Sequence, residues 1–185
     1  MQRVGGPTFR SGAGCAVVLA FAAFSTSALA QSPPARATAA IGGKAVTVQY
    51  SAPSVRGRKI FGDGGILSRD PTYPIWRAGA NAATTLKTEG ALDIGGLTIP
   101  AGAYTIYVNV KDPEAWELVV SKATGQWGLT YPGPSSDLGR VKMAMSVPPQ
   151  TVEQLKYTVT DKGNGAGELQ LAWERHIGSV TLHAK

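Results

Sequence analysis

The chain has 185 residues, of which 18 are Lys or Arg and 12 are Asp or Glu, and its formal net charge is +6 at pH 7. The basic residues are scattered and form no Lys/Arg block or nucleic-acid-binding motif, so we expect no nucleic-acid partner. Because Cys15 is the only cysteine, a disulfide within the chain is excluded.

The first thirty residues have the pattern of a secretory signal peptide. Arg3 and Arg10 form a basic start, an apolar run reads GCAVVLAFAAFS, and Ala28-Leu29-Ala30 offers a small-x-small cleavage site. The apolar run is shorter than the roughly 20 residues that a membrane-spanning helix needs. Cleavage after Ala30 would remove Cys15 and two arginines, leaving 155 residues with a formal charge of +4. We therefore expect an exported protein, periplasmic or extracellular, without membrane contact after cleavage.

The rest of the chain is predicted to be all-β. Residues 31–37, QSPPARA, are expected to form a disordered lead-in, and residues 38–185 a single domain. Segments such as KAVTVQY (residues 44–50) and AYTIYVNV (residues 103–110) alternate apolar and polar residues, which is typical of half-buried strands. Similar strands are expected in residues 116–122, 140–147, 155–159, 169–173 and 180–182.

Turn residues separate these segments. Gly42-Gly43 and Gly95-Gly96 are predicted to form two-residue hairpin turns, because glycine reaches positive φ without steric cost. No segment shows a sustained apolar period of 3.6 residues with helix caps. About nine or ten short strands with turns between them predict a jelly-roll-like β-sandwich, with a barrel as the weaker alternative.

Four segments occur in a fixed order after residue 30: YSAPSVRGRKIFG, WRAGAN, LTIPAGAYTIYV and GQWGLTY. In this order they resemble a bacterial family of exported proteins, domain of unknown function 2911. The resemblance covers almost all of the mature chain. It implies a periplasmic location and no assigned activity. The segment SRDPTYPI before Trp76 departs from the family pattern, which implies a shorter link, so the loop beside Trp76 is expected to differ.

Two of these segments contain candidate ligand-binding residues. Arg58 and Arg77 have no acidic neighbour in the sequence, and a guanidinium group suits a carboxylate or phosphate. If the fold brings them together with Trp76 and Asn81, the four side chains could hold a small anion or a sugar. The structural alternative is that the arginines donate to backbone carbonyls and that Asn81 caps a turn.

The aromatic residues allow a further alternative, a carbohydrate-binding module. Such a module needs exposed rings, and five aromatics lie in or near loops or strand ends: Tyr73, Trp76, Trp116, Trp127 and Tyr131. Large aromatic side chains more often serve the core. Trp173, which alternates with Leu169 and Leu171, is predicted to be a core residue.

The sequence gives little indication of an enzyme. No GxSxG, HExxH or P-loop motif occurs. His176 and His183 are seven residues apart, an odd spacing that puts them on opposite faces of one strand unless Gly178 introduces a bulge. We expect no cofactor or metal.

The prediction is a non-catalytic binding or structural module. The alternative is an envelope hydrolase that acts on a carbohydrate or ester through loop carboxylates, such as Asp63, Asp70, Asp93 and Asp137.

Overall fold

The computed structural model describes residues 1–2, 5 and 31–185, so nearly all of the predicted signal peptide lies outside the described residues. The first strand, β1 (Pro34–Ile41), pairs along its whole length with β2 (Lys44–Ser51). Four residues of the predicted disordered lead-in are therefore part of the sheet. Prolines are tolerated at the start of β1 because it is an edge strand.

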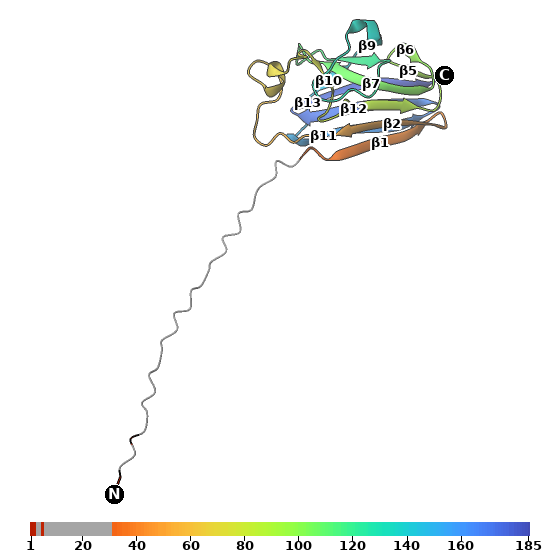
Figure 1. Ribbon diagram of the computed structural model, residues 1–185. Coiled ribbons are helices and arrows are strands. Elements are labelled where there is room, and N and C mark those ends of the chain that lie inside the picture. The colour runs from red at the N-terminus through yellow and green to blue at the C-terminus, as the bar shows by residue number, and fades with distance from the viewer. Residues whose placement is uncertain (3–4, 6–30) are drawn as a thin grey trace.

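The predicted β-sandwich is confirmed, with thirteen strands in place of nine or ten (Figure 1). The first sheet has the order β1-β2-β4-β7-β8-β9, with β3 paired to β7. Its remaining strands are β3 (Ile75–Trp76), β4 (Thr85–Thr88), β7 (Gly102–Asn109), β8 (Glu117–Ser121) and β9 (Asp137–Lys142).

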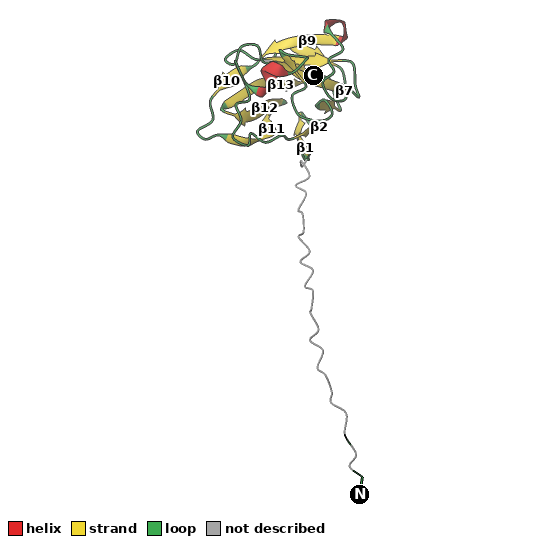
Figure 2. Cartoon of the chain, turned by 60° about the vertical axis from the view of Figure 1, so that its left-hand side comes forward, coloured by secondary structure: helices red, strands yellow, loops and turns green. Residues whose placement is uncertain are grey.

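The second sheet has the order β11-β12-β13-β5-β6, with β10 paired to β13. Its strands are β5 (Leu92–Ile94), β6 (Leu97–Ile99), β10 (Ala144–Ser146), β11 (Val152–Gly163), β12 (Ala166–Glu174) and β13 (His176–Ala184). The only helical turns in the described chain are two short 3-10 helices, η1 (Ile66–Arg69) and η2 (Pro134–Ser136) (Figure 2). None of the described helices is long and apolar enough to cross a membrane.

Residues 140–147, predicted as one strand, form parts of two strands in different sheets. The chain leaves β9 in the first sheet, passes through Met143, and enters β10 in the second sheet. Val141 and Met143 are buried and Met145 is partly buried, whereas Val147 is exposed. The alternating pattern continues across the break because the inner faces of both sheets border the same core.

The predicted glycine turns are confirmed. Gly42 and Gly43 join β1 to β2, Gly95 and Gly96 join β5 to β6, and all four have positive φ. The same geometry recurs between β11 and β12, where Asn164 and Gly165 form the turn with φ of 52° and 74°. These two-residue turns set the register of each hairpin.

The hydrophobic core fills the space between the two sheets, and large aromatic residues concentrate at one end of it. Residues 52–74, which connect β2 to β3, cover this end and insert Ile60 and Phe61 into the core, both at most 3% exposed. Figure 1 shows this segment at the opposite end of the sandwich from the C-terminus. Among the described residues, both sheets and the buried residues between them lie within residues 34–184.

We expect Gly42→Ala to destabilise the protein more than Gly43→Ala. Both substitutions place a Cβ atom at positive φ, at a cost of about 1–2 kcal/mol. Only the Cβ at position 42 would also collide with Cβ of Ala184, whereas position 43 faces open space. Urea unfolding of the two variants measures the difference. Equal losses would show that the hairpin does not depend on its contact with the end of β13.

Candidate functional site

Arg58 donates its guanidinium hydrogens to the backbone of its own loop. Nε donates to the carbonyl of Val55 at 2.9 Å, and Nη2 donates to the carbonyl of Ser54. Arg58 therefore donates to backbone carbonyls, as the structural alternative to ligand binding predicts. Together with Arg56, Arg58 also lines a hollow of about 180 Å³, and Ser32 forms part of its wall.

Asn81 is a turn residue in the left-handed region, with φ of 58°. Its side-chain amide donates to the carbonyl of Ser32 at 3.1 Å, so it fixes one wall of the hollow that Arg58 lines. The neighbouring Ala78 also has positive φ, and its carbonyl accepts hydrogen bonds from Tyr157 and Thr84. The WRAGAN segment is therefore a tight corner that the core and the sheet hold from both sides.

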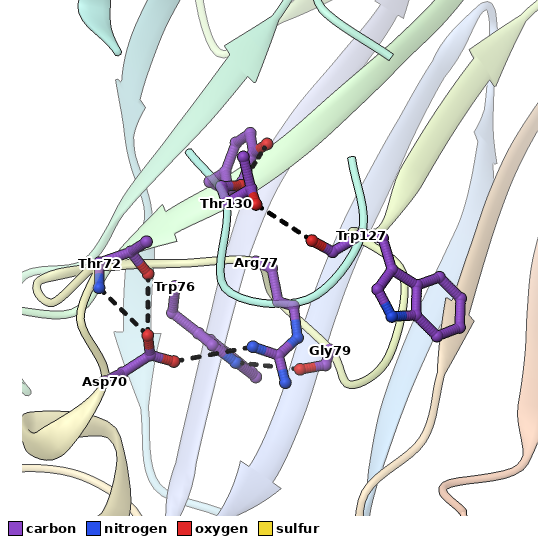
Figure 3. A network of polar contacts seen from close by, with 8 residues as sticks. Asp70, Thr72, Trp76, Arg77, Gly79, Trp127 and Thr130 are labelled. Carbon is purple, nitrogen blue, oxygen red and sulfur yellow. Dashed lines mark hydrogen bonds and ion pairs between the residues drawn. The ribbon is translucent and has the colours of Figure 1, made fainter. Parts of the chain in front are cut away.

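Trp76 and Arg77 contact different partners, Gly79 and Asp70 (Figure 3). Trp76 is 3% exposed, stacks on Trp173, and donates from Nε1 to the carbonyl of Gly79 at 3.1 Å. Arg77 lies 3.7 Å from the carboxylate of Asp70, seven residues upstream, so the fold supplies an acidic partner that does not neighbour Arg77 in the sequence. Burial lowers the pKa of Arg77, and the Asp70 carboxylate offsets part of that shift.

The structure thus gives each of the four predicted residues a contact with the protein itself. Arg58 and Asn81 meet at the segment around Ser32, and Trp76 and Arg77 are held by Gly79 and Asp70. Their binding of a ligand stays a prediction.

The predicted core role of Trp173 is confirmed, since the side chain is 1% exposed. Trp116 is also buried, and Trp127 is 68% exposed in the loop between β8 and β9. The described surface thus exposes one tryptophan strongly, together with Tyr73, which is 37% exposed.

A larger pocket lies at the end of the sandwich that the aromatic residues close. Its volume is about 490 Å³, within the range of roughly 300–1,000 Å³ that is typical of small-molecule sites. It lies between β10, the segment before β8 and the turn that joins β12 to β13. Its walls are formed by Pro113, Glu114, Met145, Ser146, Val147, Arg175 and His176.

Aromatic contacts and a carboxylate hold the imidazole of His176 at this pocket. The ring stacks on Trp116 with centroids 5.5 Å apart and an interplanar angle of 19°, and Phe61 meets it edge-on at 4.8 Å. Its Nδ1 is buried, and the carboxylate of Glu174 lies 3.5 Å from that atom. His176 lines the pocket, and its buried Nδ1 lies on the side of Glu174.

Glu174 has an unusual backbone conformation, and the backbone N–H of Ile60 holds its carboxylate. It occupies the two-residue turn between β12 and β13 with φ of 55°, a region that non-glycine residues rarely adopt. One carboxylate oxygen accepts a hydrogen bond from the backbone N–H of Ile60 at 3.0 Å, and the other faces His176. Backbone strain of this kind is concentrated at functional sites.

Burial lowers the pKa of His176 below its ordinary value, and the nearby Glu174 carboxylate offsets part of that effect. The imidazole is therefore neutral at pH 7. A neutral ring that keeps its proton on Nδ1, beside the carboxylate, carries its free lone pair on Nε2. Nε2 can then accept a hydrogen bond or coordinate a metal ion.

The two histidines lie on opposite faces of β13, as predicted. Strand β13 pairs with β12 without a register shift, so Gly178 introduces no bulge, and His183 faces away from the core. Among the described residues, no group of three or more His, Cys, Asp or Glu side chains could hold a metal ion.

The pocket does not assemble a serine–histidine pair. Ser146 lies opposite Ile177 in the register of β10 and β13, whereas His176 is one residue away. Because successive side chains of a strand point to opposite faces, Ser146 and His176 face different sides of the sheet. The hydrolase alternative rests on loop carboxylates such as Asp63 and Asp70, and it stays a prediction.

Sequence reasoning missed the pairing of Glu174 with His176. The available signal was a histidine on an apolar face, because His176 alternates with Val180 and Leu182. The sequence did not indicate that Glu174 lies beside His176, because the carboxylate reaches the ring through a turn conformation that glycine usually adopts.

Fold and site together define a class: an antiparallel two-sheet sandwich with a carboxylate-held imidazole at a pocket on one end. The chain matches the model of the family described as "Protein of unknown function (DUF2911)" over residues 32–182, and it belongs to that family. The resemblance seen in the sequence is thereby confirmed. Searches of the curated proteins and of the solved structures found no match.

We expect Trp76→Phe to lower the free energy of unfolding by about 1–3 kcal/mol, because it leaves the buried carbonyl of Gly79 without its donor. The matched control is Trp127→Phe, at an exposed ring, with an expected change within about 0.5 kcal/mol. Urea denaturation measures both. Similar small effects would contradict the structural role assigned to Trp76.

The lowered pKa of His176 predicts a pH dependence of stability. Between the ordinary value of 6.5 and the lower folded value, the unfolded chain binds more protons, so acid favours unfolding. Wild-type protein should lose more unfolding free energy from pH 7 to pH 5 than His176→Phe. From pH 7.5 to 8.5 the two should change in parallel. Equal slopes below pH 7 would contradict a buried neutral imidazole.

Proposed function

We propose that this protein is an exported, non-catalytic binding module whose ligand site is the pocket at His176. The observation that carries the proposal is the imidazole, which Glu174 and two aromatic rings hold against one wall of a preformed pocket. Export is supported by the signal-peptide pattern of residues 1–30.

The pocket combines apolar walls with a few polar groups, as small-ligand sites do. Met145, Val147 and Pro113 supply apolar surface, and Val147 is 66% exposed. His176 supplies a lone pair, and Arg175 supplies a cation in the adjoining turn. Because aromatic packing fixes the imidazole, a ligand meets an oriented acceptor without first having to order it.

The hollow lined by Arg56 and Arg58 is a second candidate site, for a small anion. Arg58 is oriented by its bonds to the carbonyls of Ser54 and Val55, which leaves Nη1 without a hydrogen bond among the described residues. The hollow has about 180 Å³ of space, and Ser32 and Pro33 form part of its wall.

Signal cleavage after Ala30 would place the new α-ammonium group one residue before Ser32. Of the four residues predicted from the sequence, Arg58 lines this hollow, and Asn81 contacts its wall through the carbonyl of Ser32.

A thermal-shift assay on residues 31–185 tests the proposed site. The probes are silver nitrate, zinc sulfate, sodium benzoate, sodium phosphate and glucose. A probe present at 100 times its Kd should stabilise the fold by about 2.7 kcal/mol. For a domain of this size that raises the Tm by about 5–10 °C. We expect at least one probe to shift wild-type protein and not His176→Phe, which keeps an aromatic ring but has no nitrogen.

His183→Phe is the matched control, because it removes the histidine on the other face of β13 and should retain the wild-type response. A panel without any shift, or shifts that His176→Phe retains, would contradict a ligand site at His176. A phosphate shift that is lost in Arg56→Gln but kept in His176→Phe would identify the arginine hollow instead.

A further inference from the structure

We propose that the pocket binds a soft monovalent metal ion, of the Cu(I) or Ag(I) class, through Nε2 of His176 and the thioether of Met145. This inference rests on the proposed function, since it names the ligand of the same pocket.

Strand pairing makes the two ligand residues diagonal neighbours on one face of the second sheet. Met145 lies opposite Gly178 in the register of β10 and β13, and His176 is two residues from Gly178 on the same face. Such diagonal neighbours have Cα atoms about 7–8 Å apart. Both residues line the same pocket, and methionine has three rotatable bonds with which to direct its sulfur.

Gly178 leaves space that a second thioether and an indole occupy. A Cβ atom at position 178 would lie 3.3 Å from Sδ of Met143 and 3.0 Å from Cε3 of Trp116. Trp116 is the ring that stacks on His176. The thioether of Met143 and the indole that stacks on His176 thus pack against one glycine of β13, which lies opposite Met145.

Glu174 completes the arrangement that metal-binding histidines need. A histidine ligand almost always interacts through its other nitrogen with a carboxylate, which fixes the tautomer and orients the ring. Here the carboxylate of Glu174 is beside Nδ1, and the N–H of Ile60 holds that carboxylate in place. Glu174 is therefore a positioning residue for metal binding.

The donor set selects the kind of ion. Thioethers are soft ligands that favour Cu(I), and imidazole suits copper, whereas zinc sites are built from thiolate, imidazole and carboxylate ligands. The described residues contain no group of three such ligands that could hold zinc. The domain of residues 31–185 has no cysteine that could compete for a soft ion. Met143 and Met145 are its only methionines.

Titration with Ag(I), which has the same preference and no redox chemistry under these conditions, tests the proposal. Silver nitrate is added to residues 31–185 in chloride-free buffer, with calorimetry and tryptophan fluorescence as readouts. We expect one strong site per chain and a change in fluorescence, because Trp116 stacks on the ligand ring. Met145→Leu, which keeps the side-chain volume, and His176→Phe should each weaken binding at least 10-fold. Glu174→Gln should weaken it by a smaller factor.

The matched control is His183→Phe, which should bind Ag(I) as the wild-type protein does. Circular dichroism of Met145→Leu and His176→Phe verifies that they remain folded. Unchanged Ag(I) binding in Met145→Leu, or Zn(II) binding stronger than Ag(I) binding, would overturn the soft-metal assignment. If Ag(I) fails to bind while benzoate shifts the Tm in a His176-dependent way, the metal is wrong and the proposed function stands. If no probe depends on His176, both are wrong.

Discussion

The packing around Phe61 is the interaction on which this end of the molecule depends. The ring contacts Trp76, Trp116, Trp173 and His176, with centroids between 4.8 and 5.9 Å apart. Those four residues come from β3, the segment before β8, β12 and β13, so one side chain joins both sheets and the loop that closes them. Aromatic pairs of this kind contribute about 0.5–1.5 kcal/mol each beyond the area they bury. The shape of the pocket follows from this packing, because the same contacts fix the plane of His176.

Several buried polar atoms that lack a hydrogen-bond partner lie at the same end of the sandwich. Nε1 of Trp116, Nε1 of Trp173 and Nδ1 of His176 are buried without a hydrogen bond among the described residues. Glu174 is held there at positive φ. Each such feature costs about 1–3 kcal/mol. Folded proteins pair nearly all buried polar groups, and three of the exceptions among the described residues lie at this aromatic end.

The arginines show why a cation without a local acidic neighbour is not thereby free. Arg77 meets Asp70 because the chain turns back between them, and Asp70 itself is held by two hydrogen bonds from Thr72. Arg58 satisfies carbonyls that an irregular loop leaves unpaired. A guanidinium group offers five donors, so it can join backbone segments that have no sheet partner of their own. The contacts at the WRAGAN corner hold this loop against its own backbone and against the segments around Ser32 and Asp70.

The sequence by itself determined the sandwich class, most strand positions, the glycine turns and the opposite faces of the two histidines. These features depend on residues within a few positions of each other, where a period of two and positive-φ glycines leave a direct trace. The sequence did not determine that residues 140–147 divide between two sheets, that β1 begins at Pro34, or that Asp70 pairs with Arg77. It also did not show that Glu174 holds His176 beside Met145. Those facts were decided by the tertiary structure, because each depends on which segments the packing of the two sheets brings together.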